Sequence, residues 1–378
     1  MNIAYVSDQR YPAIGTDTIQ VATMCSAFGA AGARVTLYYL ADDPGRALSP
    51  AELARHYEIE ANFDTVPLSS PGKPLRGIEK MILAERAAQR ISGSSADLIY
   101  SRNLPVILAG LRRTDLPVFY ETYRPWPIQR RHKAWLFRRM RRAERFRGLI
   151  LHSQLAADSY REVGFAPERL LVALNGHNPA SLNPRLTRHE ARRSLGLADG
   201  FTVTYAGDVM PGKGLDIVLD IAVRLPEIRF LLVGSKSRNR IDRRAEKMAN
   251  VRIFGWRKIS EVSPFLFAAD VLVIPPSRAP LERRGHTVLP VKSFYYLAAG
   301  RPILAGDTPD VREVVVPGRN GILVPPGDVH AAAAALKLLM RSPEECERLG
   351  ATARADGSAR TWSARADAIL GFLGQRIS

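Results

Sequence analysis

The sequence predicts an α/β protein of two domains, each built on a parallel β-sheet. The chain has 378 residues, about twice what one ordinary α/β core needs. In both halves, short apolar runs of strand length alternate with segments of helical periodicity. This alternation is typical of parallel sheets covered by helices on both faces. The series restarts after the turn-rich segment 167–188, which we interpret as a linker.

The first half is expected to form one parallel sheet. Its strands are predicted at 2–7, 34–40, 97–100, 117–120 and 148–152. A helix is predicted over 19–31, and Gly32 follows it where a left-handed C-terminal residue is common. The amphipathic last segment, 362–377, is expected to pack back on this half. The first domain is therefore predicted to comprise 1–172 together with 362–378.

The second half repeats the alternation, and we assign residues 173–361 to a second domain. Its strands are predicted at 201–206, 230–233, 251–254, 271–274 and 302–305. Its helices are predicted at 215–224, 260–268, 292–299 and 331–340. Open parallel sheets bind ligands at the carboxyl ends of their strands, so two facing sheets predict a site in the cleft between them.

Composition excludes several classes of protein. No apolar run reaches the roughly 18 residues of a membrane-spanning helix, and the N-terminus lacks the features of a signal peptide. Cys25 and Cys346 suggest neither a disulfide framework nor a metal cluster. The net charge of +17 favours anionic partners. We expect a cytoplasmic protein, with the inner face of the membrane as a candidate location.

The most specific local feature is a glycine-rich turn between the strand 201–206 and the helix 215–224. Its glycines allow an anion to approach the backbone, and Lys213 adds a positive charge at the helix start. An ordinary turn with a solvated lysine is the simpler interpretation. A P-loop NTPase is disfavoured, because Gly214 stands where the magnesium-binding Ser or Thr should be. No dinucleotide-binding glycine fingerprint follows the first strand.

Further segments share their order and spacing with one known family. They are the loop Gly207–Gly214, the strand segments Phe230–Gly234, Val251–Trp256 and Ala268–Ser277, the turn Leu297–Leu304, Arg312-Glu313, Gly318–Asp328, and in the first half Gly15, Glu121 and Asn175-Gly176. Together they resemble the family 4 glycosyltransferases. That family has the GT-B fold, in which two Rossmann-like domains face each other across a cleft. The resemblance implies a retaining enzyme that needs no metal or other cofactor.

The resemblance also implies residues that bind the donor. Gly207, Lys213 and Gly214 would hold the donor diphosphate and neutralise the leaving group, and Gly15 would approach the same phosphates. Further donor contacts are implied at Asp208, Gly212, Gly234, Trp256, Arg257, Val288, Leu289, Lys292 and Tyr295. A core-edge aromatic remains an alternative for Trp256, and a solvated helix residue remains one for Lys292.

The catalytic residues implied by the resemblance are incomplete. Besides Lys213, they are Glu121, Tyr123 and Thr287. Tyr123 stands where the family usually has His. The family's Glu-X7-Glu pair is replaced by Thr287 and Tyr295, and Glu282 lies five residues early. Asp208 stands where the family often has Arg. These departures leave two hypotheses: an active retaining transferase, or a weak or inactive homologue that serves as a binding or assembly subunit.

The segment 124–147 contains ten Arg or Lys residues and one acid, Glu144. Its apolar residues are interleaved with the charges: Trp126, Trp135, Leu136, Phe137 and Met140. We expect this segment to bind an anionic membrane surface, with a solvated basic face as the alternative. No nucleic-acid motif accompanies it, so no nucleic-acid partner is expected. The predicted function is transfer of a sugar from a UDP- or GDP-sugar donor to a glycan or lipid-linked acceptor, in polysaccharide or glycolipid synthesis.

Overall fold

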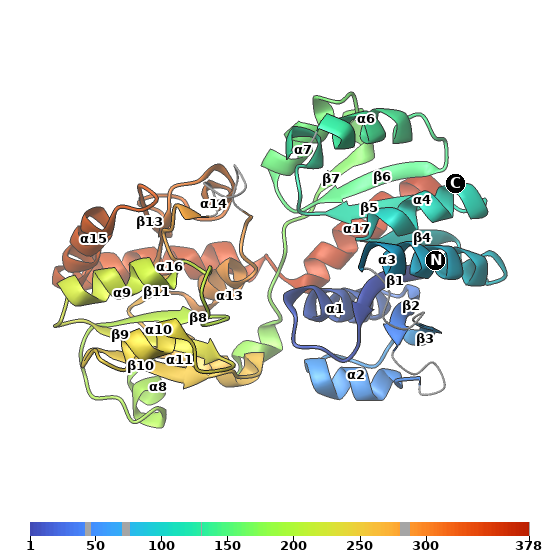
Figure 1. Cartoon of the computed structure of the whole chain (residues 1–378). Coiled ribbons are helices and arrows are strands. Elements are labelled where there is room, and N and C mark those ends of the chain that lie inside the picture. Colours follow the sequence, from blue (N-terminus) through green and yellow to red (C-terminus); the bar gives the residue numbers. More distant parts are fainter. Residues whose placement is uncertain (42–46, 70–75, 130, 280–287, 378) are drawn as a thin grey trace. The chain divides into compact units, whose positions relative to one another are not determined.

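The structure is a computed structural model that describes residues 1–41, 47–69, 76–129, 131–279 and 288–377 (Figure 1). The chain divides into two compact units. Unit 1 comprises Met1–Leu174 and Trp362–Ser378, and unit 2 comprises Asn175–Thr361. Each unit has one parallel sheet with helices packed against it, which confirms the predicted fold class of two Rossmann-like parallel-sheet domains.

The sheet of unit 1 has seven parallel strands in the order β3-β2-β1-β4-β5-β6-β7. These are β1 (Asn2–Arg10), β2 (Arg34–Ala41), β3 (Asp64–Ser69), β4 (Leu98–Ser101), β5 (Val118–Thr122), β6 (Phe146–Leu151) and β7 (Leu170–Val172). The strand order reverses between β1 and β4, and such a switch point is where open parallel sheets bind ligands.

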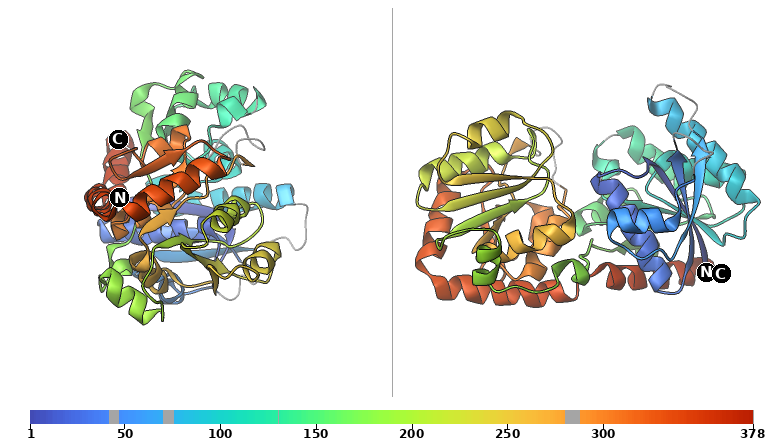
Figure 2. Two further views of the ribbon diagram at one scale, coloured as in Figure 1. Left: turned by 90° about the vertical axis from the view of Figure 1, so that its left-hand side faces the viewer. Right: turned by 90° about the horizontal axis from the view of Figure 1, so that it is seen from below.

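Helices cover both faces of this sheet. They are α1 (Thr16–Ala30), α2 (Pro50–Tyr57), α3 (Arg76–Ser92), α4 (Leu104–Arg113), α5 (Trp126–Gln129), α6 (Arg131–Met140), α7 (Gln154–Arg161), the 3-10 turn η1 (Pro167–Arg169) and the C-terminal α17 (Trp362–Ile377). The last helix packs beside α1 and against β6 (Figure 2). Its Phe372 ring lies 2.7 Å from where a Cβ on Gly148 would be, so this contact requires a glycine in β6.

The sheet of unit 2 has six parallel strands in the order β10-β9-β8-β11-β12-β13. These are β8 (Thr202–Ala206), β9 (Arg229–Ser235), β10 (Val251–Gly255), β11 (Val271–Val273), β12 (Ile303–Gly306) and β13 (Gly321–Val324). Its helical elements are η2 (Pro179–Leu182), α8 (Arg188–Ser194), α9 (Leu215–Arg224), α10 (Arg240–Ala245), α11 (Ile259–Ala268), α13 (Lys292–Ala299), α14 (Pro309–Arg312), α15 (Val329–Arg341) and α16 (Pro343–Ser358). Here the order reverses between β8 and β11.

The interval 167–188 was predicted as a linker but contains a strand. The short β7 pairs with β6 in parallel register at the edge of the sheet. Its three residues are only partly buried and follow a proline turn, so no buried apolar run marked them as a strand. In the described part of the chain, no helix combines the length and apolar character that crossing a membrane requires.

Candidate functional site

The glycine-rich loop of unit 2 lies at the switch point of its sheet. It connects the end of β8 to the start of α9, next to the segment that follows β11. A Cβ on Gly214 would lie 2.6 Å from Ser277 Cβ and 3.1 Å from Pro275 Cβ. Gly214 also has φ 79°, and it precedes α9 without a side-chain cap, which leaves the first N–H groups of that helix unpaired by a side chain.

The start of the loop also requires glycine. Gly207 has φ 146°, and a Cβ there would collide with the ammonium of Lys292. The N–H of Gly207 donates to the carbonyl of Val233 over 2.9 Å, which attaches the loop to the end of β9. Gly234 packs against the Gly207 backbone so closely that a side chain would not fit. The sequence prediction named both glycines, and the structure brings them together.

Three lysines gather around this loop. The Nζ atoms of Lys236 and Lys213 lie 2.9 and 3.6 Å from the carboxylate of Asp208. Lys292, the first residue of α13, has its Nζ 3.5 Å from the centre of the Tyr205 ring. Sequence reasoning missed Lys236, although its place two residues after Gly234, at the carboxyl end of β9, was a usable signal.

The charges of the loop shift one another's pKa values. Burial lowers the pKa of Lys292 well below its usual value, and the nearby positive charge of Lys213 lowers it further. Burial acts to raise the pKa of Asp208, but Lys236 and Lys213 together outweigh burial and lower it. Bound anion would stabilise the protonated form of every lysine here, since opposite charges favour the charged state.

The other predicted donor residues of unit 2 differ in how deeply they are buried. Gly212 and Arg257 are exposed. Trp256 is partly buried, and its backbone N–H donates to the carbonyl of Ser235 over 2.8 Å. Val288 and the buried Leu289 lie four and three residues before Lys292, the first residue of α13. The predicted donor contact at Trp256 stays a prediction, because its partial burial fits either interpretation.

Tyr295 of α13 contacts the segment at the start of unit 2. Its hydroxyl accepts a hydrogen bond of 3.4 Å from the backbone N–H of Asn178, and its ring meets His177 edge-on at 6.0 Å. The next residue, Tyr296, bonds both the N–H and the carbonyl of Ala206, at 2.8 and 3.2 Å. Tyr296 thereby fastens α13 to the end of β8. The predicted Thr287, with Glu282, lies outside the described residues.

Glu121 lies at the carboxyl end of β5 and is 2% exposed. One carboxylate oxygen accepts from Tyr100 over 2.6 Å, and the other lies 2.6 Å from His152 Nε2 and 3.1 Å from Arg365. Arg102 approaches the same oxygen at 3.8 Å. Arg365 belongs to α17 and is itself buried, so this ion pair joins the C-terminal helix to the centre of the sheet.

Burial acts to raise the pKa of Glu121, but the neighbouring groups outweigh this effect. Arg365, the hydrogen bond with His152 and Arg102 hold the pKa of Glu121 well below its usual range. Burial lowers the pKa of His152 to about 4 despite the adjacent carboxylate. At neutral pH this cluster therefore holds an ionised glutamate, two arginines and an uncharged histidine.

Tyr123 and Gly15 occupy the same edge of unit 1. Tyr123 is partly buried, and its hydroxyl accepts from Arg124 Nε over 3.2 Å. Gly15 is the exposed residue before α1, and Thr18 Oγ1, at 3.7 Å, is the nearest atom to its Cβ position. Arg102, which follows β4, binds Asp17 of α1 at 3.3 Å. The predicted approach of Gly15 to the donor stays a prediction.

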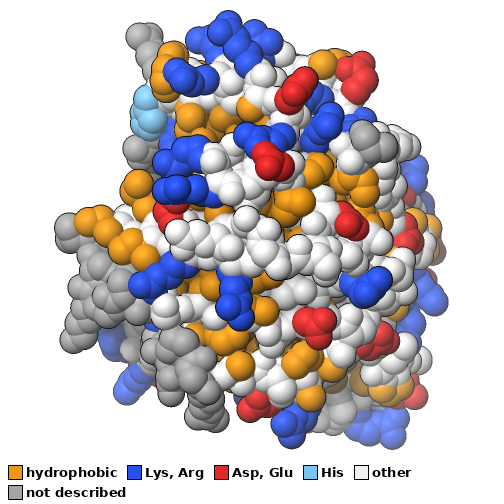
Figure 3. All heavy atoms as spheres, turned by 90° about the vertical axis from the view of Figure 1, so that its right-hand side faces the viewer, with side chains coloured by type: hydrophobic (Ala, Val, Ile, Leu, Met, Phe, Trp, Pro, Cys, Tyr) orange, Lys and Arg blue, Asp and Glu red, His pale blue; other side chains and the backbone are white. Residues whose placement is uncertain are grey.

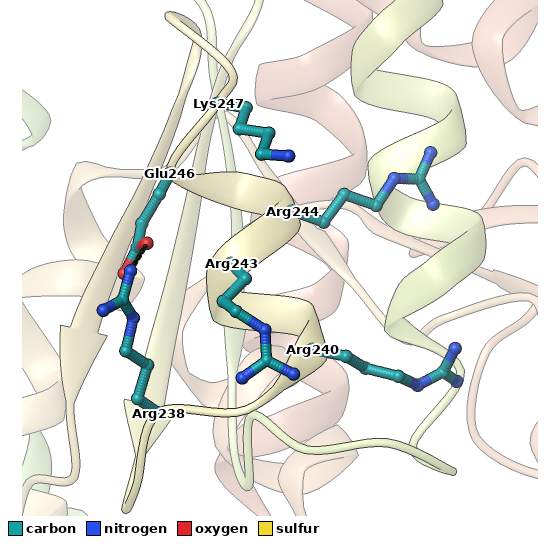
Figure 4. Close-up of a pocket in the computed structure, with 6 residues that line it drawn as sticks. All are labelled: Arg238, Arg240, Arg243, Arg244, Glu246 and Lys247. Atoms are coloured by element: carbon teal, nitrogen blue, oxygen red, sulfur yellow. Dashed lines mark hydrogen bonds and ion pairs between the residues drawn. The ribbon is translucent and has the colours of Figure 1, made fainter.

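A basic cavity of about 400 Å³ lies around α10 in unit 2 (Figure 4). Its lining residues are Arg238, Arg240, Arg243, Arg244, Glu246 and Lys247. Three of these arginines pair with carboxylates at 2.5 to 2.9 Å: Arg238 with Glu246, Arg240 with Asp216, and Arg244 with Asp220. This cavity is therefore partly neutralised by ion pairs. Among the described residues, no group of three or more acidic, His or Cys side chains could hold a metal ion.

Two family descriptions match consecutive parts of the chain. "Glycosyltransferase Family 4" matches residues 18–181, and "Glycosyl transferases group 1" matches residues 200–342. The chain belongs to the family 4-like glycosyltransferases. The family resemblance predicted from the motifs is thus confirmed.

A curated relative of this glycosyltransferase-family chain is the sulfoquinovosyl transferase of Arabidopsis thaliana. The two are 25% identical over 302 residues, which cover 75% of this chain and 58% of the relative. The chain spans about half the length of the curated relatives it matches, from 47% to 58% for three of them.

Solved structures confirm the GT-B fold. Sucrose-phosphate synthase from Thermosynechococcus elongatus superposes with a TM-score of 0.78 at 20% identity, covering 99% of this chain and 98% of that one. Anabaena HepE in complex with UDP-glucose gives a TM-score of 0.75 at 18% identity, covering 99% and 100%.

Proposed function

We propose that this protein is an active retaining glycosyltransferase that moves a sugar from a nucleotide-sugar to a glycan or lipid-linked acceptor, in polysaccharide or glycolipid synthesis. The observation that carries the proposal is the grouping of Lys213, Lys236 and Lys292 around the glycine loop at the carboxyl end of β8. Ammonium groups and unpaired helix N–H groups at a switch point suit a diphosphate.

The chemistry follows from the leaving group. When the bond from the sugar to the diphosphate breaks, negative charge grows on the phosphate, and Lys213 with the first N–H groups of α9 would stabilise that charge. This stabilisation needs no metal. Retention would arise from attack on the face that the diphosphate leaves, which requires no protein nucleophile.

Glu121 and Tyr123 have different roles in this proposal. Because Glu121 is 2% exposed and both its oxygens are bonded, we assign it the positioning of His152 and Arg102 in place of the predicted catalytic contact. Tyr123 is partly exposed and keeps its predicted role beside the reacting sugar. Its hydroxyl can donate a hydrogen bond.

The donor class is proposed as a UDP- or GDP-sugar. The likeness to a structure that contains UDP-glucose makes uracil the first base to test. Trp256 and Arg257 follow β10 at the same sheet edge and are proposed to border the base.

The decisive experiment replaces Lys213 with alanine and measures affinity for UDP and UDP-glucose by calorimetry. Charge-assisted hydrogen bonds contribute about 1.5–3 kcal/mol, so we expect affinity to fall by roughly ten- to a hundredfold. Lys337→Ala, an exposed lysine of α15, is the matched control and should bind like the parent. Equal affinity in the parent and Lys213→Ala would refute the site. Binding without turnover across nucleotide-sugars would refute the transferase.

Peripheral membrane binding is proposed through α6 and its flanks. Phe137 and Met140 point into the core and are unavailable to lipid, whereas Trp135 is 61% exposed beside the exposed Arg138 and Arg139. Lys and Arg side chains lie beside hydrophobic ones on the upper part of the face in Figure 3. This placement would put the protein at the cytoplasmic face of the membrane. Anionic vesicles at physiological salt should carry the protein upward in a flotation assay. Trp135→Ser should reduce the fraction of protein that floats. Equal flotation with neutral vesicles would contradict the proposal.

A further inference from the structure

Arg124 is held between two aromatic rings at the carboxyl edge of the unit 1 sheet. It is partly buried and lies two residues beyond β5. Its guanidinium carbon is 5.1 Å from the ring centre of Tyr123 and 5.0 Å from that of Trp126. Its Nε donates to the Tyr123 hydroxyl over 3.2 Å. Stacking on aromatic faces is a typical way to fix a guanidinium in one orientation.

The backbone beneath this side chain is fixed as well. The N–H of Arg124 donates to Thr122 Oγ1 over 3.1 Å, and its carbonyl accepts from the Tyr160 hydroxyl over 3.1 Å. The indole N–H of Trp126 donates to the Tyr120 hydroxyl over 3.0 Å. The arginine is therefore pre-organised, so little side-chain freedom would be lost on binding a ligand.

The outer end of this guanidinium is uncommitted. Within the part of the chain that the structure describes, no carboxylate pairs with Arg124, and its two Nη atoms have no hydrogen-bond partner. Arg102 at the same edge differs, since it binds Asp17 and Gln20 and approaches Glu121. Two Nη groups in one plane form the fork that binds phosphate or carboxylate through two parallel hydrogen bonds.

A second cation reinforces the site. Lys133 Nζ lies 5.3 Å from the ring centre of Trp126, the indole on which Arg124 also stacks. One aromatic platform thus carries two positive charges. Such a pair favours a doubly charged phosphate monoester over a neutral sugar hydroxyl.

We propose that Arg124 binds a phosphate group of the acceptor, so that the acceptor substrate is a phosphorylated one. This inference rests on the proposed function, because it assigns the second substrate of the same transfer. Tyr123, placed there beside the reacting sugar, adjoins Arg124 and would bring the acceptor phosphate next to the sugar. A soluble sugar phosphate and a lipid-borne phosphate share this chemistry.

The test uses the 378-residue chain, saturated with UDP so that the glycine-rich loop of unit 2 is occupied. It is titrated with inorganic phosphate and, separately, with phosphatidylcholine vesicles that contain phosphatidic acid. Arg124→Gln should weaken binding of at least one probe by about tenfold or more, because a charged two-bond contact is lost. Arg124→Lys should retain part of the affinity. Arg55→Gln, at an exposed arginine of α2 outside the proposed membrane-binding segment, is the matched control.

The two probes distinguish the sources of the phosphate. Loss confined to vesicles supports a lipid-borne acceptor, and loss with inorganic phosphate supports a soluble one. Unchanged binding of both probes by Arg124→Gln overturns the inference, as does equal loss in Arg55→Gln. If UDP itself does not bind, the proposed function fails separately, and the same titrations in a Lys213→Ala background still decide the role of Arg124. Melting temperatures identify any variant that is misfolded.

Discussion

Asp208 provides a sharp test of the glycine-rich loop of unit 2 and its lysines, because removing the charge of Asp208 should tighten binding of the donor. Its carboxylate lies 2.9 Å from Lys236 and 3.6 Å from Lys213, where a diphosphate would compete with it for the same ammonium groups. Asp208→Asn keeps the shape of the side chain and removes the charge. We expect UDP to bind more tightly to this variant than to the parent.

The size of the effect follows from the geometry. A phosphate oxygen that shares the Lys236 ammonium with Asp208 would lie about 5 Å from the carboxylate. Two unit charges at that distance repel by about 0.8 kcal/mol in a water-like dielectric. With roughly two charges on the nearby diphosphate, the repulsion reaches about 1.5 kcal/mol, or about tenfold in affinity. Salt should reduce this gain, since Asp208 is 29% exposed.

Calorimetric titration with UDP at two salt concentrations measures the change, and titration with uridine provides the neutral ligand. Uridine should bind both proteins equally, because it lacks the phosphates that Asp208 would repel. Asp367→Asn, an exposed aspartate of α17, controls for a general change in net charge. Weaker binding of UDP to Asp208→Asn would show that Asp208 contacts the donor directly, and the electrostatic reasoning would be wrong.

Two further predictions concern the buried cluster of unit 1. Arg365→Met should lower the free energy of unfolding by about 3 kcal/mol, because it leaves the charge of Glu121 under-compensated. Adding Glu121→Gln to the same chain should restore part of this loss. Urea denaturation followed by tryptophan fluorescence measures both changes, and a loss below ~1 kcal/mol would contradict the assignment. His152 has a pKa lowered to about 4 from an ordinary 6.5, so its contribution is fully present above pH 6.5 and declines as pH falls toward 4. His152→Gln should flatten the dependence of stability on pH in that window, and an unchanged slope would exclude His152 as its source.

Much of unit 2 could be predicted because its strands are buried apolar runs. The strand predicted at 201–206 is β8, Thr202–Ala206, and the one predicted at 271–274 is β11, Val271–Val273. Both lie in the sheet interior, where near-continuous apolar sequence is the signature of a parallel strand. The edge strand β7 has only partly buried residues and gave no such signal.

How well each site could be predicted depends on whether its residues are near one another in the sequence. The glycine loop is local, since its strand, turn and helix are consecutive in sequence. The partner of Glu121 is not: Arg365 lies 244 positions away and is brought to the carboxylate by α17. The membrane prediction stays a prediction, but spacing alone did not reveal which of its apolar residues are accessible: Phe137 and Met140 fill the core, whereas Trp135 faces outward.

Asp208 stands where the family often has arginine, and this difference alone would weaken a diphosphate site. In the proposed site, other elements supply the positive charge, since Lys236 follows directly after β9 and α13 brings Lys292 to the same loop. With Lys213, three ammonium groups and one carboxylate leave two positive charges when every group is ionised. Burial lowers the pKa of Lys292, but a bound diphosphate would raise the pKa of this lysine again. Donor binding should therefore take up a proton at any pH where Lys292 is partly deprotonated, and calorimetric titrations of UDP in buffers that differ in ionisation enthalpy would measure that uptake.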